Sequence, residues 1–191
     1  MDRLLGGLDN EITMLNQIKV SRPSSSIEDA IDMLLGCHER IRHFSSVAVK
    51  LAHAQGASPA DIVEAANGLL RYFTIALPLH EADENDSLRP RLRRALPKGE
   101  LAESALDAMV EQHEFIDEVA EQLVPLWRMV KSNPEKLDEV SGEMCQLSGR
   151  LNDLFSAHLQ LEEETIFPAL QRFVRGEELE SMVREMKERR Q

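Results

Sequence analysis

The sequence predicts an all-α protein, an up-down-up-down four-helix bundle with short flanking N- and C-terminal helices. Leu, Ala, Glu, Met and Arg, which are good helix formers, dominate the 191 residues. Strand-length runs of alternating Val, Ile, Thr or Tyr do not occur. Four long stretches instead carry apolar residues at helical spacing, with short turns between them. Such a pattern predicts antiparallel helices around one core.

The chain divides into three expected segments. Residues 1–24 form an N-terminal arm or short helix, because an apolar stripe from Leu4 to Ile18 is weakened by two glycines. Residues 25–173 form the bundle, whose first helix is capped by Ser25 or Ser26. Residues 174–191 form a highly charged C-terminal helix with a narrow apolar face.

Turn residues set the expected limits of the four long helices. Gly56 ends the first, and Pro59 occupies the first helical position of the second. Pro78 lies inside the second helix, which we expect it to bend. Residues 89–99 form a basic connection, and a turn at Asn133 precedes the fourth helix. The expected helices span residues 27–54, 59–86, 100–130 and 135–173.

One motif occurs twice, and its polar residues suit a metal ion. His80 to Leu92 and His158 to Leu170 both contain His, three residues, Glu, three residues, Leu or Ile, one residue, and Pro. Residues four apart share one face of a helix, so His80 pairs with Glu84 and His158 with Glu162. An imidazole and a carboxylate on adjacent turns form half of a transition-metal site.

A second repeat adds one histidine to each half. The second motif occurs around His38 and His113 and consists of Asp, five residues, His, Glu, one residue and Ile. Its two copies are 75 residues apart, and the two copies of the first motif are 78 residues apart. The chain is therefore predicted to be two copies of a helical hairpin. All four motif histidines lie at similar distances from their turns, so they reach one level of the core. Such a polar cluster is costly in an apolar core unless a cation compensates it.

The ligand types favour paired iron or manganese ions. Cysteine thiolates are absent from the set, which excludes a structural cysteine zinc site. Imidazoles and carboxylates from four helices are typical of di-iron and di-manganese centres. His43 and His53 serve as comparisons, because their positions on the first helix point away from that level.

These motifs resemble the hemerythrin-like, or HHE cation-binding, domain family over roughly residues 27–172. The resemblance implies a non-haem centre of two iron ions, oxo- or hydroxo-bridged, with manganese or zinc as less favoured metals. It implies that Glu84 and Glu162 bridge the ions and that the four histidines are terminal ligands. Oxygen-carrying members have a further histidine where this chain has Asp117, and place their last carboxylate at the position of Glu163. Both residues are additional candidate ligands.

The implied function is to bind, sense or store a small ligand, O2 or NO, or iron. The alternative is a di-iron enzyme or iron donor in nitrosative or oxidative stress defence, acting in NO or peroxide reduction or in iron–sulfur cluster repair. The sequence leaves open whether the protein is an enzyme. The two halves differ where Arg42 corresponds to Asp117, and we expect that asymmetry to distinguish the two metals.

Composition excludes other partners. A net charge of −12 argues against nucleic acid, whose phosphates require a basic patch. Apolar runs approaching the ~20 residues of a membrane span are absent. The first fifteen residues lack the apolar stretch of a signal peptide, and two cysteines form no disulfide framework, so we expect a cytoplasmic protein. The amphipathic terminal arms could form a homodimer surface.

Overall fold

A computed structural model describes residues 26–191, and it confirms the all-α fold class. The expected N-terminal helix lies outside the described residues. Strands do not occur in the described part of the chain. Its α-helices are α2 (Ser26–Ala52), α3 (Pro59–Arg71), α4 (Leu77–Ala82), α5 (Arg89–Ala95), α6 (Leu101–Ser132), α7 (Leu137–Leu161), α8 (Phe167–Phe173) and α9 (Glu177–Glu188).

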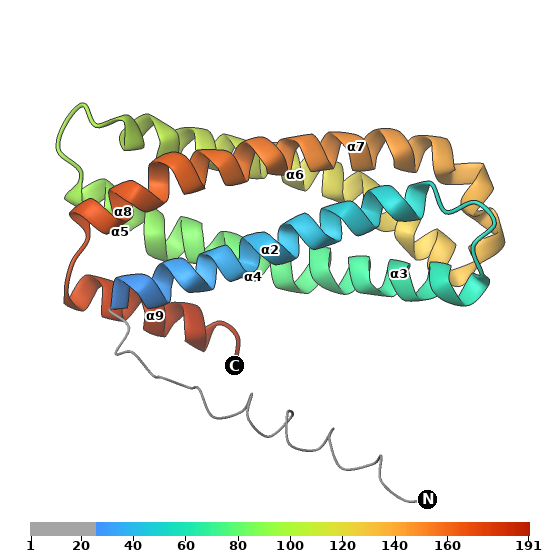
Figure 1. The fold of residues 1–191 in the computed structure, drawn as a ribbon, viewed down its shortest axis with the longest axis horizontal. Helices are drawn as coiled ribbons and strands as arrows, with labels where there is room; N and C mark the ends of the chain where they lie inside the picture. The colour runs from blue at the N-terminus through green and yellow to red at the C-terminus, as the bar shows by residue number, and fades with distance from the viewer. Residues whose placement is uncertain (1–25) are drawn as a thin grey trace, which may run out of the picture.

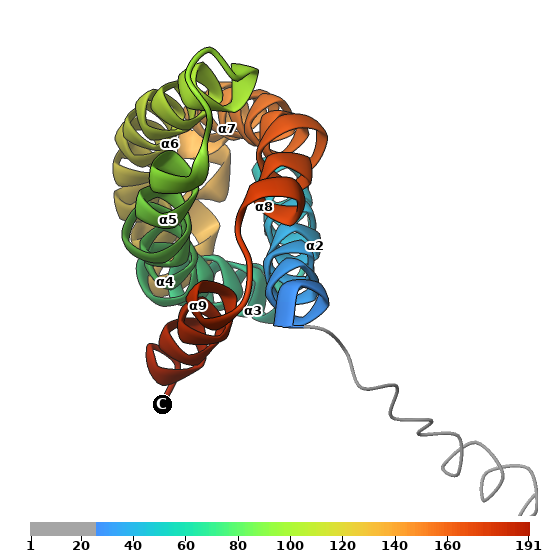
Figure 2. The same ribbon diagram turned by 90° about the vertical axis from the view of Figure 1, so that its left-hand side faces the viewer.

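Four helical columns make up the bundle (Figure 1). The first is α2, the second is α3 to α5, the third is α6, and the fourth is α7 with α8. The turn from α2 to α3 and the turn from α6 to α7 lie at one end, and the connection from α5 to α6 lies at the other. Seen end-on, the columns surround a common axis, and α9 lies outside them beside α2 and α4 (Figure 2).

Three π-helical segments interrupt the second and fourth columns. They are η1 (Tyr72–Ala76), η2 (Asp83–Leu88) and η4 (Glu162–Ile166), and a short 3-10 segment, η3 (Pro134–Lys136), precedes α7. Each π segment ends two residues before a proline: Pro78, Pro90 or Pro168. A proline ring clashes with the carbonyl four residues earlier, and that carbonyl lies inside the π segment each time. The wider π turn accommodates the ring without ending the helix.

The predicted end of the second helix was wrong for this reason. Residues 89–99 were expected to form a connection, but the helix continues through Pro90 to Ala95. Pro90 takes one of the first positions of α5, where a missing N–H costs little. The remaining link to α6 is short, and Gly99 adopts a positive φ of 85° within it.

The apolar core consists of two clusters, one toward each end of the bundle. Leu34 belongs to one cluster and Ile41 to the other, and His38 lies between them on α2. Met109 and Ile116 flank His113 on α6 in the same way. Trp127 and Tyr72 pack with other aromatic rings in the cluster that contains Ile41. The level between the clusters is the level at which the histidines were predicted to meet.

Helix α9 attaches to the bundle through a buried carboxylate. Asp83, in η2, is fully buried and accepts hydrogen bonds from Arg189 and Arg190, which directly follow α9. Arg189 also donates to Ser87 Oγ at 2.8 Å. Leu179, Met182, Val183 and Met186 supply the apolar face of α9. The C-terminal helix therefore supports the segment that carries Glu84.

Replacing Arg189 and Arg190 together by alanine should destabilise the fold by roughly 3 kcal/mol, because Asp83 would remain buried without a partner. Denaturation in urea measures the free energy of unfolding. Adding Asp83→Asn to that variant should restore part of the loss, since it removes the uncompensated charge. Equal stability of the double variant and the wild type would contradict this role for Asp83.

Candidate metal centre

Six predicted side chains gather in the buried layer between the two core clusters. None exposes more than 5 % of its surface: His38, His80, Glu84, His113, His158 and Glu162. Each column contributes, because α2 carries one histidine, α6 carries one, and the two π-containing columns each carry a histidine and a glutamate. The expected convergence of the two hairpins therefore occurs in the structure.

The π segments begin at or beside the two glutamates. Glu162 is the first residue of η4, and its carbonyl accepts from the N–H of Phe167, five residues later. Glu84 is the second residue of η2, and its carbonyl accepts from Arg89 in the same way. The partner histidines lie four residues earlier, in regular α-helix. Each motif therefore combines one α turn before its glutamate with a wider turn after it.

The six residues form two groups that share both glutamates. His38, His80, Glu84 and Glu162 make one group, and their potential ligand atoms lie within 4.8 Å of one another. His113 and His158 complete the second group with the same two glutamates. Glu84 directs Oε1 to His80 Nε2 at 2.9 Å and Oε2 to His113 Nε2 at 3.1 Å. A carboxylate with one oxygen toward each group is arranged to bridge two cations.

Glu162 lies between the other two histidines. Its Oε2 is 3.0 Å from His38 Nε2 and 3.6 Å from His158 Nε2. Several of these inward atoms are buried and lack a well-aligned hydrogen bond within the described part of the chain: His38 Nε2, His80 Nε2, Glu84 Oε1, and both carboxylate oxygens of Glu162. Buried polar atoms normally have hydrogen-bond partners. Close approach without hydrogen-bond alignment fits donors aimed at an ion between them, so the site fits a pair of metal ions.

Comparison with known proteins identifies the family. The model of the Hemerythrin HHE cation binding domain matches residues 29–170. The chain belongs to this hemerythrin family. It is also 25 % identical over 179 residues to an uncharacterized protein from Haemophilus influenzae, which covers 92 % of this chain and 98 % of the relative. The match ends before α9, so the hemerythrin domain comprises the four columns.

Among residues 26–191, none of the helices combines the length and the apolar character needed to cross a bilayer.

Three of the four histidines in the two ligand groups have a side-chain partner on the outer nitrogen. His38 Nδ1 meets Glu163 Oε1 at 2.7 Å. His158 Nδ1 meets Gln112 Oε1 at 3.1 Å, and His113 Nδ1 meets Asn85 Nδ2 at 3.3 Å. Such contacts fix the orientation of the rings and the nitrogen that faces the metal.

The fourth ring, His80, lies beside a thiol. Burial alone would raise the pKa of Cys37, but His80 and the guanidinium groups of Arg40 and Arg190 outweigh burial and lower it. Arg40 Nη2 donates to Cys37 Sγ at 3.0 Å. The thiol is therefore a polarised neighbour of the centre and stays outside both ligand groups.

The buried glutamates raise the pKa of most of the histidines beside them. Burial opposes charge on His38, His80 and His113, but Glu162 or Glu84 outweighs burial and raises the pKa of all three. Burial would raise the pKa of Glu84, yet the adjacent imidazoles hold it well below its usual range. Burial lowers the pKa of His158. Protons and metal ions therefore compete for the same atoms.

Two additional candidate ligands lie outside both groups. Asp117 is exposed on α6, where burial of part of its carboxyl raises its pKa. Glu163 is bound to the outer nitrogen of His38, on the side away from the shared glutamates. The geometry therefore favours Glu162 over Glu163 as the bridging residue. Glu163 instead holds the ring of His38 through its outer nitrogen.

The two comparison histidines also lie elsewhere. His43 is exposed and packs edge-on against Phe44. His53 is exposed near the end of α2, where its Nδ1 contacts the Val49 carbonyl at 2.8 Å.

Several contributing residues were not predicted from the sequence. Asn85 and Gln112 each adjoin a predicted ligand, but only the pairing of helices shows which ring they contact. Glu81 follows His80 directly and was equally missed; burial, then the charge of Asp117, raises its pKa to about 7. The one available signal for Glu81 was its place directly after His80, because a glutamate also directly follows His38 and His113.

The metal-free protein should lose stability as pH rises above about 6.5, the ordinary value for histidine. Below that pH, protonation of His38, His80 and His113 stabilises the fold fully, and the contribution disappears as pH rises through their raised folded-state pKa values. Each excess proton changes stability by about 1.4 kcal/mol per pH unit. The lowered pKa of His158 acts in the opposite direction. Because three histidines have raised pKa values and one has a lowered value, the net effect is a loss of stability as pH rises.

Urea denaturation of metal-free protein at a series of pH values measures this dependence. A His43→Gln variant should retain it, because His43 is exposed. Saturating Zn²⁺ should reverse it, since the metal displaces protons and binds more tightly as pH rises. Metal-free protein that becomes more stable between pH 7 and 9 would contradict this account.

Proposed function

We propose that this protein holds a non-haem pair of iron ions and binds a small diatomic ligand, O2 or NO, at that pair. The observation that carries the proposal is the presence of two groups of donors that share Glu84 and Glu162. A single ion would leave two of the four buried histidines unused. Imidazole and carboxylate donors from four helices favour iron over softer or oxygen-only metals.

The donor count leaves room for an added ligand. Each ion would be held by two of the histidines and by the two shared glutamates. Asp117, which occupies the place of a further ligand in oxygen carriers, lies outside both groups and is exposed. Four protein donors leave an iron ion with open coordination positions. Iron held there would supply those positions and its redox reactivity toward O2 or NO.

Burial limits the size of the ligand. The six side chains expose between 0 and 5 % of their surface, and core clusters lie on both sides of them. A bulky organic substrate would have to separate packed helices, whereas a diatomic molecule needs only small fluctuations of the core. The enclosure therefore favours ligand binding over turnover of a larger substrate. We further propose a cytoplasmic location, which the two free cysteines support.

Metal analysis of variants tests the shared centre. The wild type should contain two iron ions per chain. Glu84→Ala should lose both ions, because it removes a donor common to both groups, whereas His80→Ala should lose or weaken one. His43→Ala is the matched control and should retain both. Wild-type protein that takes up no iron under reducing conditions would overturn the proposal.

Mixing reduced, iron-loaded protein with O2 or NO in a stopped-flow spectrometer tests the ligand function. A persistent optical change that reverses when the gas is removed is the expected result. Rapid decay to a released product would contradict binding and instead support the stress-defence enzyme. The His80→Ala variant should show a smaller change, because one of its two ions is lost.

A further inference from the structure

The two halves of the centre differ at one repeat-equivalent pair of outer contacts. His38 and His113 occupy the same place in the two hairpins, and each places Nε2 on a shared glutamate. The residue after that glutamate then meets Nδ1 of the same ring. It is Glu163 for His38 and Asn85 for His113. The fold therefore presents a carboxylate in one half where it presents an amide in the other.

Metal binding at Nε2 places the ring proton on Nδ1, so the outer partner must accept a hydrogen bond. Glu163 Oε1 already lies 2.7 Å from His38 Nδ1. Asn85 directs its nitrogen at His113, while its buried Oδ1 lacks a partner within the described residues. Rotating the amide by half a turn would supply an acceptor, because the two amide atoms are nearly indistinguishable in shape. That acceptor remains neutral.

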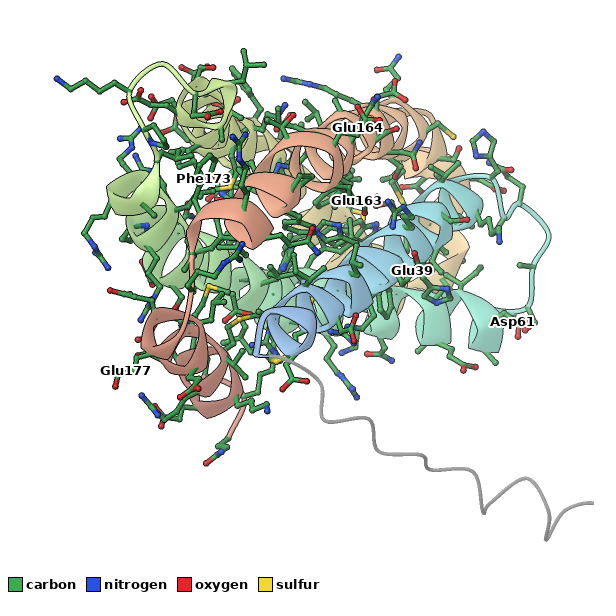
Figure 3. The ribbon with its side chains drawn as sticks, turned by 60° about the vertical axis from the view of Figure 1, so that its left-hand side comes forward. Glu39, Asp61, Glu163, Glu164, Phe173 and Glu177 are labelled. Carbon is green, nitrogen blue, oxygen red and sulfur yellow. The ribbon has the colours of Figure 1, made fainter. Side chains whose placement is uncertain are left out.

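The two halves also differ at a second repeat-equivalent pair, in which one member, Arg42, holds the Glu163 carboxylate in place. Arg42 corresponds to Asp117, and Arg42 Nη2 lies 2.7 Å from Glu163 Oε1. Arg42 Nη1 also binds Glu39, so the guanidinium is tied to its own helix. Figure 3 shows Glu163 between the end of α7 and α2, with Glu39 on the adjacent face of α2. The other half has an exposed carboxylate, Asp117, at the place of this arginine.

None of the other three rings has a carboxylate on its outer nitrogen among the described contacts. His158 meets the amide oxygen of Gln112, and His80 lies beside the Cys37 thiol. A charged acceptor forms a stronger hydrogen bond than a neutral one and makes the imidazole a better metal donor. A carboxylate on the outer nitrogen therefore distinguishes the His38 ring from the other three.

We propose that Glu163 is a positioning residue that makes the half built on His38 and His80 the tighter of the two metal sites, so that this half fills first. The inference rests on the proposed pair of metal ions and adds an order of loading to it. Glu163 acts through His38 and is not itself a ligand.

Titration of the metal-free protein with Co²⁺ against a coloured chelator resolves the two binding steps without any turnover. The wild type should bind two ions in separated steps. Glu163→Gln should weaken the tighter step by about 10- to 100-fold and leave the weaker step nearly unchanged. Asn85→Asp should tighten the weaker step, because it gives His113 a charged acceptor. The visible spectrum of bound Co²⁺ reports whether the coordination itself has changed.

Glu164→Gln is the matched control. It removes the same charge one residue away, and Glu164 contacts Gln160 and not a histidine. An equal effect of Glu164→Gln and Glu163→Gln would overturn the inference, as would wild-type sites of equal affinity. The inference would also be overturned if Glu163→Gln left metal binding unchanged, or if it weakened the weaker binding step in place of the tighter one. Should Glu163→Gln fail to fold, an unchanged weaker step in Asn85→Asp overturns it. Wild-type protein that binds no metal refutes the proposed function instead.

Discussion

Two carboxylates and four imidazoles lie in an apolar core without access to water, and the rest of the structure compensates that cost. Several of their inward atoms approach closely but lack aligned hydrogen bonds within the described residues. Burying such charges is unfavourable unless a cation, or protons on the histidines, balance them. The core is accordingly divided into two apolar clusters with one polar layer between them. The six side chains that can hold metal ions are thus also the group whose burial is most costly to the fold.

The residues that meet in this layer were predictable because helical spacing and the internal repeat are properties of the sequence alone. His80 with Glu84, and His158 with Glu162, follow from a spacing of four residues. The outer contacts were not predictable, because the partner of His113 or His158 depends on the rotation and register of neighbouring helices. The end of the second column was missed because Pro90 was taken as a helix end, and periodicity does not reveal a π turn.

Structure beyond the matched domain also serves the centre. The family match ends at residue 170, yet the two arginines that follow α9 supply the guanidinium groups that compensate Asp83. Asp83 directly precedes Glu84, and Arg190 also reaches the Cys37 thiol at 3.7 Å. The C-terminal helix therefore supports the His80 side of the centre from outside the bundle. The helix and its apolar face were predictable from the sequence, whereas the buried carboxylate to which the helix is attached was not.

The π segments bear on how relatives of this chain can vary in length. A π turn holds one residue more than an α turn, so each is equivalent to a single insertion accommodated within a continuous helix. Deleting one residue from η2 would leave a regular α turn, and Leu88 and Leu92 would still face the core. The proline that follows would again clash with a carbonyl. A relative that lacks the extra residue of a π segment is therefore expected to lack the proline after it as well.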